Sequence, residues 1–182
     1  MHIRFSNAKG LPVLDDTSDE HIANISSILL EPDKGTVEGF FVSIPCFLSS
    51  DVLFLSTFDI IHWGAHVRVS HADVLSPLEE RVRLWELAEQ GRTILGQKIV
   101  SEAGKIIGTC RDVQFNTKTF TLEWIFPRRL LHWGIPIPAS AIIEVKPEAV
   151  IVRERSAMSE EPTMRETVLA PLEELKKTPT AG

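Results

Sequence analysis

Apolar and polar residues alternate over short runs along most of the chain, and turn-forming residues separate these runs. In one run, Phe120, Leu122 and Trp124 alternate with Thr121 and Glu123. A period of two residues is typical of a strand with one buried face. The pattern predicts strands at residues 25–30, 37–44, 52–58, 67–69, 97–100, 106–115, 119–125, 142–145 and 149–152.

A different period between residues 76 and 91 predicts a helix. Ser76 is a typical N-cap, Pro77 suits the first helical position, and Glu79 follows in the first turn. Gly91 can end the helix. The residues expected on its apolar face are Leu78, Val82, Trp85 and Ala88.

The chain also contains an internal repeat. The tripeptide His-Trp-Gly at 62–64 recurs at 132–134, and a closely spaced pair of glycines precedes each copy. Repetition in the same order indicates two copies of one module. The glycines expected at structural turns are Gly35, Gly39, Gly64, Gly104, Gly108 and Gly134.

These patterns together predict a mostly β fold of two small barrels in tandem. The first barrel is expected at residues 1–75, the linking helix at 76–91, the second barrel at 92–155, and a disordered, flexible C-terminal tail at 156–182, where large apolar residues are few. Two modules in one chain can face each other as the subunits of a symmetric dimer do. We therefore expect a pseudo-dimer within one chain.

Composition restricts the class of protein. Of the 182 residues, 43% are hydrophobic and 24% are charged, which is the balance of a globular protein. No apolar run approaches the ~20 residues of a membrane helix, and the first residues lack the apolar core of a secretory signal. We therefore expect a cytoplasmic protein with Cys46 and Cys110 as buried free thiols. The formal charge of −6 argues against sequence-independent binding of nucleic acid.

Few residues are arranged for catalysis. Three histidines, His62, His66 and His71, lie close together in sequence and come nearest to a zinc site, but a strand across them would separate their side chains. Adjacent carboxylates stand in polar segments, and the chain has neither a nucleophile turn nor a phosphate-binding loop. We therefore expect no metal, no cofactor and no enzymatic activity.

Aromatic residues beside cationic ones are the expected contacts with a partner. Arg128 and Arg129 stand near Trp133, where cation and stacking contacts with RNA are one possibility. The repeated tripeptide is expected to be a structural corner first, with each tryptophan filling a barrel, and a binding feature second. The candidate partner-binding residues are His62, Trp63, Arg128, Arg129, His132 and Trp133.

A family resemblance lies in the second copy, between residues 93 and 153. Its pattern is carried by 96–99, by the glycines at 104 and 108, by 112–115, by 137–138 and by 149–152. In these residues the chain resembles the PRC-barrel domain, the module named after the cytoplasmic part of the photosynthetic reaction-centre H subunit. Residues 22–85 follow the pattern less closely, because Val67-Arg68 stands in place of Ile137-Pro138.

The resemblance implies a small, strongly bent barrel and no shared chemistry. We accordingly predict a non-enzymatic adaptor that recognises a protein partner. The first alternative is an RNA-linked assembly factor, similar to the ribosome maturation factor that carries such a domain. The second alternative is a small-molecule binder or an enzyme. Fold alone does not choose among the three.

Overall fold

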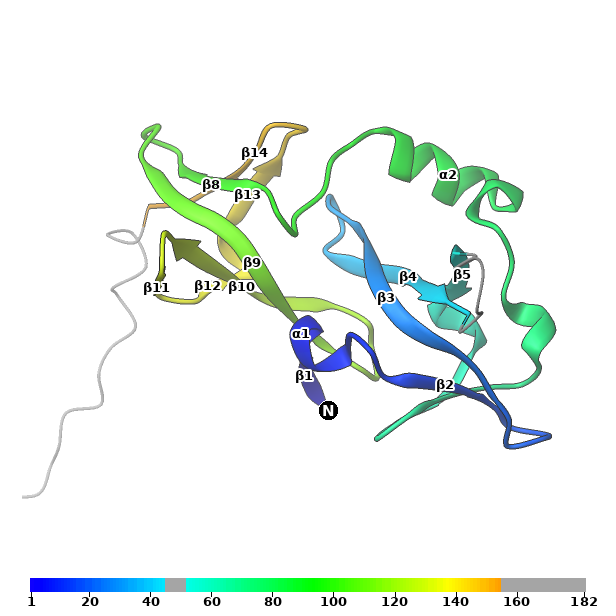
Figure 1. The fold of residues 1–182 in the computed structure, drawn as a ribbon. Coiled ribbons are helices and arrows are strands. Elements are labelled where there is room, and N and C mark those ends of the chain that lie inside the picture. Colours follow the sequence, from blue (N-terminus) through cyan, green and yellow to red (C-terminus); the bar gives the residue numbers. More distant parts are fainter. Residues whose placement is uncertain (45–51, 155–182) are drawn as a thin grey trace, which may run out of the picture.

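The computed structural model describes residues 1–44 and 52–154, and its strands form two sheets that lie side by side (Figure 1). The predicted mostly β fold is therefore confirmed. In the described part of the chain, no helix is both long and apolar enough to cross a membrane. The predicted tail at 156–182 lies outside the described residues.

The first sheet has six strands in the order β5-β4-β3-β2-β7-β6. All neighbours are antiparallel except β2 and β7, which run parallel. The strands are β2 (Pro12–Asp15), β3 (His21–Glu31), β4 (Thr36–Ser43), β5 (Val52–Ser56), β6 (Ile60–Trp63) and β7 (Val67–Val69).

The second sheet has the order β11-β10-β9-β8-β14-β13, and β12 also pairs with β10. Its parallel pair is β14 and β8. The strands are β8 (Lys98–Ser101), β9 (Ile106–Asn116), β10 (Leu122–Arg129), β11 (His132–Trp133), β12 (Ile137–Pro138), β13 (Ile142–Val145) and β14 (Ala149–Val152).

Short helical segments connect and cover the sheets. The α-helices are α1 (Phe5–Ala8) and α2 (Val82–Glu89), and the 3-10 turns are η1 (Thr57–Asp59), η2 (Ala72–Val74), η3 (Leu78–Glu80) and η4 (Ala139–Ala141). In Figure 1, α2 lies beside the first sheet, on the side of β4 and β5. Residues of η3 and α2 pack there in a small apolar cluster with Phe54 of β5.

The two sheets share one topology and one pairing register. The strands correspond in pairs. The pairs are β2 with β8, β3 with β9, β4 with β10, β5 with β12, β6 with β13 and β7 with β14. Irregularities also coincide, since the β2–β3 register shifts between Val13 and Leu14 and the β8–β9 register shifts between Ile99 and Val100. Residues at equal places in the two registers are called corresponding residues below.

Backbone conformation matches at the corresponding turns. Gly10 and Gly96 have φ values of 86° and 87°, Asp19 and Gly104 have 59° and 82°, and Gly35 and Phe120 have 63° and 50°. Positive φ strains a residue with a Cβ atom. The same unusual turns therefore occur in both sheets, and two of these three pairs use different residue types.

The sheets meet at the turns of two corresponding hairpins. Thr36 forms an isolated antiparallel bridge with Thr121, its own corresponding residue. The backbone hydrogen bonds are reciprocal as well, because Val37 N donates to Phe120 O over 2.7 Å and Leu122 N donates to Gly35 O over 2.7 Å. Each sheet thus offers the same surface to the other.

One apolar core joins the two sheets, and this core explains a difference from the expected closed barrels. Buried residues from both sheets belong to one cluster, in which the Phe40 and Phe115 rings lie 5.7 Å apart. Among the described residues, the two edge strands β5 and β6 do not pair with each other, so the first sheet does not close on itself, and neither does the second. A sheet whose apolar face is covered by another layer does not need to close to bury that face.

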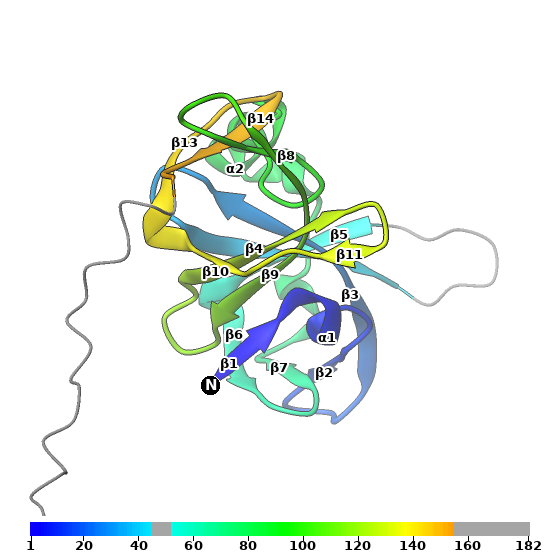
Figure 2. The same ribbon diagram turned by 90° about the vertical axis from the view of Figure 1, so that its left-hand side faces the viewer.

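The N-terminal segment lies against the second sheet, although it precedes the first. Strand β1 (His2–Arg4) pairs antiparallel with β9, with Ile3 opposite Phe115. Asp112 of β9, which is buried, accepts hydrogen bonds from Ser6 N at 3.0 Å and Ser6 Oγ at 2.6 Å. Figure 2 shows β1 and α1 beside β9 from a second direction.

The linking helix is shorter than predicted, and its expected apolar face is right only in part, because Leu78 and Ala88 pack in the small cluster but Val82 and Trp85 are exposed. A 3-10 turn ends at Glu80, and Arg81 leaves helical geometry with φ −109° and ψ 75°. The phase of α2 is therefore reset, and Leu84 and Leu87 are its buried residues, whereas Val82 is 67% exposed. Gly91, with φ 64°, follows the helix as expected.

Two of the six glycines predicted at turns lie inside strands. Gly39 is in β4 and Gly108 is in β9. A Cβ atom at Gly39 would lie 2.3 Å from Leu55 O, and one at Gly108 would lie 2.9 Å from Arg128 O. These positions require glycine because a neighbouring strand approaches closely. Gly35 and Gly104 are in turns, as predicted.

Candidate functional site

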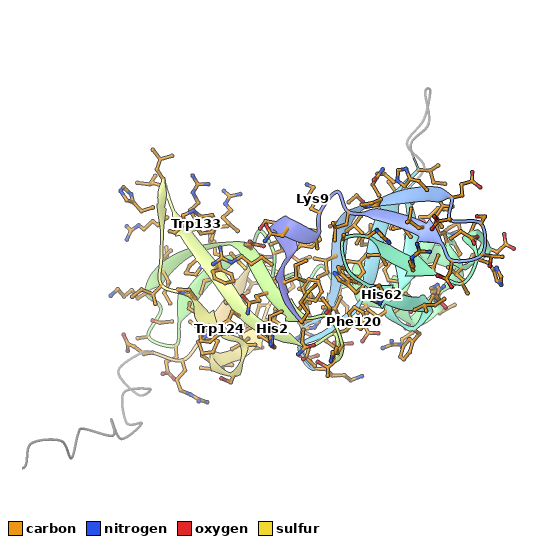
Figure 3. All side chains as sticks on the ribbon, turned by 90° about the horizontal axis from the view of Figure 1, so that it is seen from below. His2, Lys9, His62, Phe120, Trp124 and Trp133 are labelled. Carbon is orange, nitrogen blue, oxygen red and sulfur yellow. The ribbon has the colours of Figure 1, made fainter. Side chains whose placement is uncertain are left out.

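The candidate site is the hairpin of β10 and β11, which extends away from the second sheet (Figure 3). Arg128 pairs with Trp133 and Arg129 with His132, which leaves Leu130 and Leu131 alone at the turn. Two-residue turns of this kind require positive φ and usually contain Asn or Gly. Leu130 nevertheless has φ 53°, so the turn places leucine where local conformation disfavours it.

The tip of this hairpin is apolar and open to solvent. Leu130 is 89% exposed, Leu131 80%, Ile135 59% and Trp133 55%. Scattered apolar side chains are ordinary on a surface, but four large ones on one short segment indicate an interaction site. We call residues 128–135 the apolar hairpin.

Cationic groups lie at the base of the apolar hairpin. The Arg128 guanidinium lies over the Trp133 ring, 5.5 Å from its centroid. Arg128 Nε is shielded from solvent and has no hydrogen-bond partner among the described residues. Arg and Trp are the residue types that most often dominate binding energy at protein interfaces.

The hairpin is anchored to the sheet on one side. Gly134 N donates a 2.9 Å hydrogen bond to Pro127 O, and a Cβ at Gly134 would lie 3.0 Å from Pro127 Cγ. Gly134 thus permits the returning strand to pass close to Pro127. The base of the hairpin is held in place while its tip stays exposed.

The first tripeptide has different surroundings from the second. Trp63 packs between the sheets, with ring centroids 5.0 Å from Phe40, 5.7 Å from Phe115 and 6.0 Å from Phe120. His62 is exposed. The structure therefore does not bring the six candidate residues together, and it leaves four of them in the apolar hairpin.

The predicted equivalence of the two tripeptides is wrong. Trp63 stands opposite Val67 in the β6–β7 pair, and the residue at that place in the second sheet is Val145, opposite Val150. Trp133 stands in β11, which pairs with β10. Two identical tripeptides share only their local sequence. The position of each in a sheet depends on the strand with which it pairs.

The histidines and carboxylates considered as catalytic or metal-binding groups do not form such a site in the described residues. Within the described ranges, no group of three or more His, Cys, Asp or Glu side chains is placed to hold a metal ion. Hydrogen bonds from the backbone N–H groups of Ser18, Thr17 and Ala72 lower the pKa of Asp15. This carboxylate closes a turn.

Cys110 is a buried free thiol, as predicted, and Cys46 lies outside the described residues. Burial raises the pKa of the Cys110 thiol to about 12. A nucleophilic cysteine needs an accessible thiolate near neutral pH. Cys110 is therefore a packing residue.

Sequence reasoning missed the leucines of the hairpin and Ile135. The usable signal was an unbroken apolar pair, Leu130-Leu131, at a point where the flanking residues indicate a chain reversal. Consecutive large apolar residues at a turn are unlike the polar residues that turns usually contain. Such a pair therefore indicates an exposed apolar surface, as the nearby arginines indicate a charged one.

Comparison with known families finds a match in the first half of the chain. Residues 1–76 match the family model of the PRC-barrel domain, which confirms the resemblance to this family for the first part of the chain. The match lies in the first half of the chain, whereas the residues on which the resemblance was recognised lie mainly in the second half. No curated protein matches the chain.

Proposed function

We propose that this chain, which carries a PRC-barrel domain at residues 1–76, is a non-enzymatic adaptor that binds a protein partner through the apolar hairpin. The observation that carries the proposal is the exposure of Leu130, Leu131, Trp133 and Ile135 on one projecting segment. Burying such side chains against a partner removes apolar area from water, at about 25 cal/mol per Å².

We further propose that the second sheet is another module of the PRC type. The shared strand order, the shared register shifts and the corresponding positive-φ turns support this proposal. The reciprocal hydrogen bonds at Thr36 and Thr121 favour two modules related by an approximate two-fold axis, as in a symmetric dimer. In such an arrangement the self-complementary surfaces are used within the chain, and the hairpin remains for an external partner.

A protein partner is favoured over RNA by the balance of side chains. The hairpin carries two arginines, Arg128 and Arg129, beside four large apolar residues, and the chain has a formal charge of −6. RNA binding depends on neutralising several phosphates and is steeply sensitive to salt. A surface that is mostly apolar is better suited to a protein with an apolar recess.

The test is capture of partners by the full-length protein from native extract. The double variant Leu130→Ser, Leu131→Ser and the single variant Trp133→Ala are expected to lose the partner, because both remove apolar area from the tip. Trp85→Ala is the matched control, since Trp85 is 38% exposed and lies on α2, outside the hairpin.

Two results would contradict the proposal. One is equal recovery of the same partner by the wild type and the double leucine variant. The other is recovery that disappears after nuclease treatment, which would favour the RNA-linked alternative.

A further inference from the structure

The seam between the two sheets has two corresponding corners that are packed very differently. At the first corner, four aromatic rings meet: Phe40, Trp63, Phe115 and Phe120, with all measured centroid distances between 5.0 and 6.4 Å. Phe120 contributes its ring from the turn of one hairpin, and Trp63 contributes its indole from β6. Figure 3 places Phe120 at this end of the seam.

Every corresponding residue at the second corner is smaller. The shared register places Ile125 where the first corner has Phe40, and Leu30 where it has Phe115. It places Val145 in the position of Trp63. At the hairpin turn, Gly35 stands in the position of Phe120, with a matching positive φ.

The missing rings leave an open cavity at the second corner. Its volume is about 320 Å³, and its walls include Gly35, Leu122 and Val145. A Cβ atom at Gly35 would meet only Leu122 Cβ, at 4.0 Å, so the space beside this glycine is empty. Thr121 and Ser140 add hydroxyl groups to the lining.

An ion pair holds one wall of the cavity in position. Asp33, on the rim, accepts a 2.8 Å hydrogen bond from Arg92 Nη1 and a second one from Arg92 Nη2. Arg92 Nε also donates to Val145 O over 2.8 Å, so one guanidinium links the hairpin turn to β13. The two walls on either side of the cavity are therefore tied together while the cavity stays open.

We propose that this cavity is a binding site for a small planar aromatic ring, which takes the place that the indole of Trp63 and the phenyl ring of Phe120 occupy at the first corner. The volume is at the lower end of small-molecule sites, which is enough for one ring system. Apolar side chains such as Leu122, Ile142 and Val145 can face a ring, while the hydroxyl groups and the charged side chains of Asp33, Lys34 and Glu144 also line the cavity. The proposal does not involve the apolar hairpin.

The experiment is a titration of the full-length protein with indole, followed by the backbone amide resonances in NMR. Saturable shifts are expected at residues that line the cavity, such as Gly35, Thr121 and Ser140. Gly35→Phe copies Phe120 into the cavity and is expected to weaken indole binding by about tenfold or more, which is at least 1.4 kcal/mol.

Two further variants keep the test decisive. Gly104→Phe is the matched control, because Gly104 also has positive φ but has nothing within 4 Å and does not line the cavity, so indole binding is expected to be unchanged. Ser140→Trp blocks the mouth from an exposed position without altering the core, and the same loss of binding is expected even if Gly35→Phe folds poorly.

Absence of saturable shifts in the wild type would overturn the proposal. Undiminished binding to the folded Ser140→Trp variant would overturn it as well, because indole would then bind elsewhere.

Discussion

Trp63 and Trp133 occur in the same tripeptide, but they differ in what their rings contact. Trp63 packs against three phenylalanines between the sheets, whereas Trp133 is 55% exposed and is covered in part by Arg128. Side-chain type alone therefore does not assign a role. The residue whose ring does not support the core is the one that is free to bind.

Alanine substitutions should separate these two roles. Trp63→Ala is expected to reduce the free energy of unfolding by about 3 kcal/mol, because it leaves a cavity among aromatic rings. Trp133→Ala is expected to change it by less than about 0.5–1 kcal/mol, as for surface substitutions, while capture of the partner is lost. Urea unfolding of both variants measures the difference, and equal destabilisation would contradict the packing described for Trp63.

Asp15 should give the protein part of its acid sensitivity. Its carboxylate is stabilised in the folded state by three backbone N–H donors, so its folded pKa lies below the unfolded value. Such a group contributes stability above the unfolded pKa of about 4, and that contribution is lost as the pH falls through the folded pKa.

The variant Asp15→Asn should therefore have a lower melting temperature near pH 7 and a flatter dependence on pH below about 5. Melting temperatures from pH 2 to 7 provide the measurement. Parallel curves for the two proteins would mean that Asp15 is not a source of the acid sensitivity.

At the scale of an element, a break in helical geometry before α2 changes which of its residues are buried. The 3-10 turn at 78–80 and the non-helical Arg81 rotate α2 relative to the predicted pattern. Leu84 then enters the small cluster with Phe54 and Leu78, and Val82 points to solvent.

Substitutions on the two faces of α2 are expected to differ. Leu84→Ala should cost about 2–4 kcal/mol, since it truncates a buried side chain in a defined cluster. Val82→Ala should be within about 0.5 kcal/mol of the wild type, because Val82 is mostly exposed. Chemical denaturation of the two variants measures this difference. A larger loss of stability for Val82→Ala than for Leu84→Ala would contradict the packing described for α2.

At the scale of the whole molecule, the N-terminal segment connects the beginning of the chain to the second sheet. Phe5 and Ala8 are buried, and β1 extends the sheet beside β9. The buried Asp112 carboxylate fixes this segment by accepting both hydrogen bonds from Ser6. Residues 2–4 therefore form part of the second sheet, and residues 5–8 pack beside it.

Asp112→Ala should uncouple this segment. The substitution removes the acceptor of the buried Val113 N–H and of the two part-buried hydrogen bonds from Ser6, which is expected to cost about 1–3 kcal/mol. Hydrogen exchange should accelerate at the amides that pair β1 with β9. Ser6→Ala in the Asp112→Ala background should add little further loss, because the interacting group is already absent; full additivity would show that the two side chains act independently.

Much of the secondary structure followed from local pattern. Runs of apolar and β-branched residues bounded by turn residues located β9, β13 and β14 to within a residue or two, because such runs suit buried strands. The left-handed turns at Gly35 and Gly104 followed from the low steric cost of glycine there. The family resemblance depended on the same local features.

The candidate site was predicted only in part. Arg128, Arg129, His132 and Trp133 do lie together in one hairpin, because they are close in sequence. Trp63 was grouped with them by its tripeptide, but it packs in the core instead. The leucines at the tip were missed because their exposure depends on how far the hairpin extends from the sheet, which local sequence does not record.

The sequence by itself determined the mostly β character of the chain and the places of many of its strands and turns. Only the tertiary structure decided which strands pair, that β2 and β7 and likewise β8 and β14 run parallel, and that β1 joins the other sheet. It also decided that the two sheets share one core and do not close separately. The physical reason is that periodicity reports the burial of each residue, whereas the partner that buries it is chosen by contacts between residues distant in sequence.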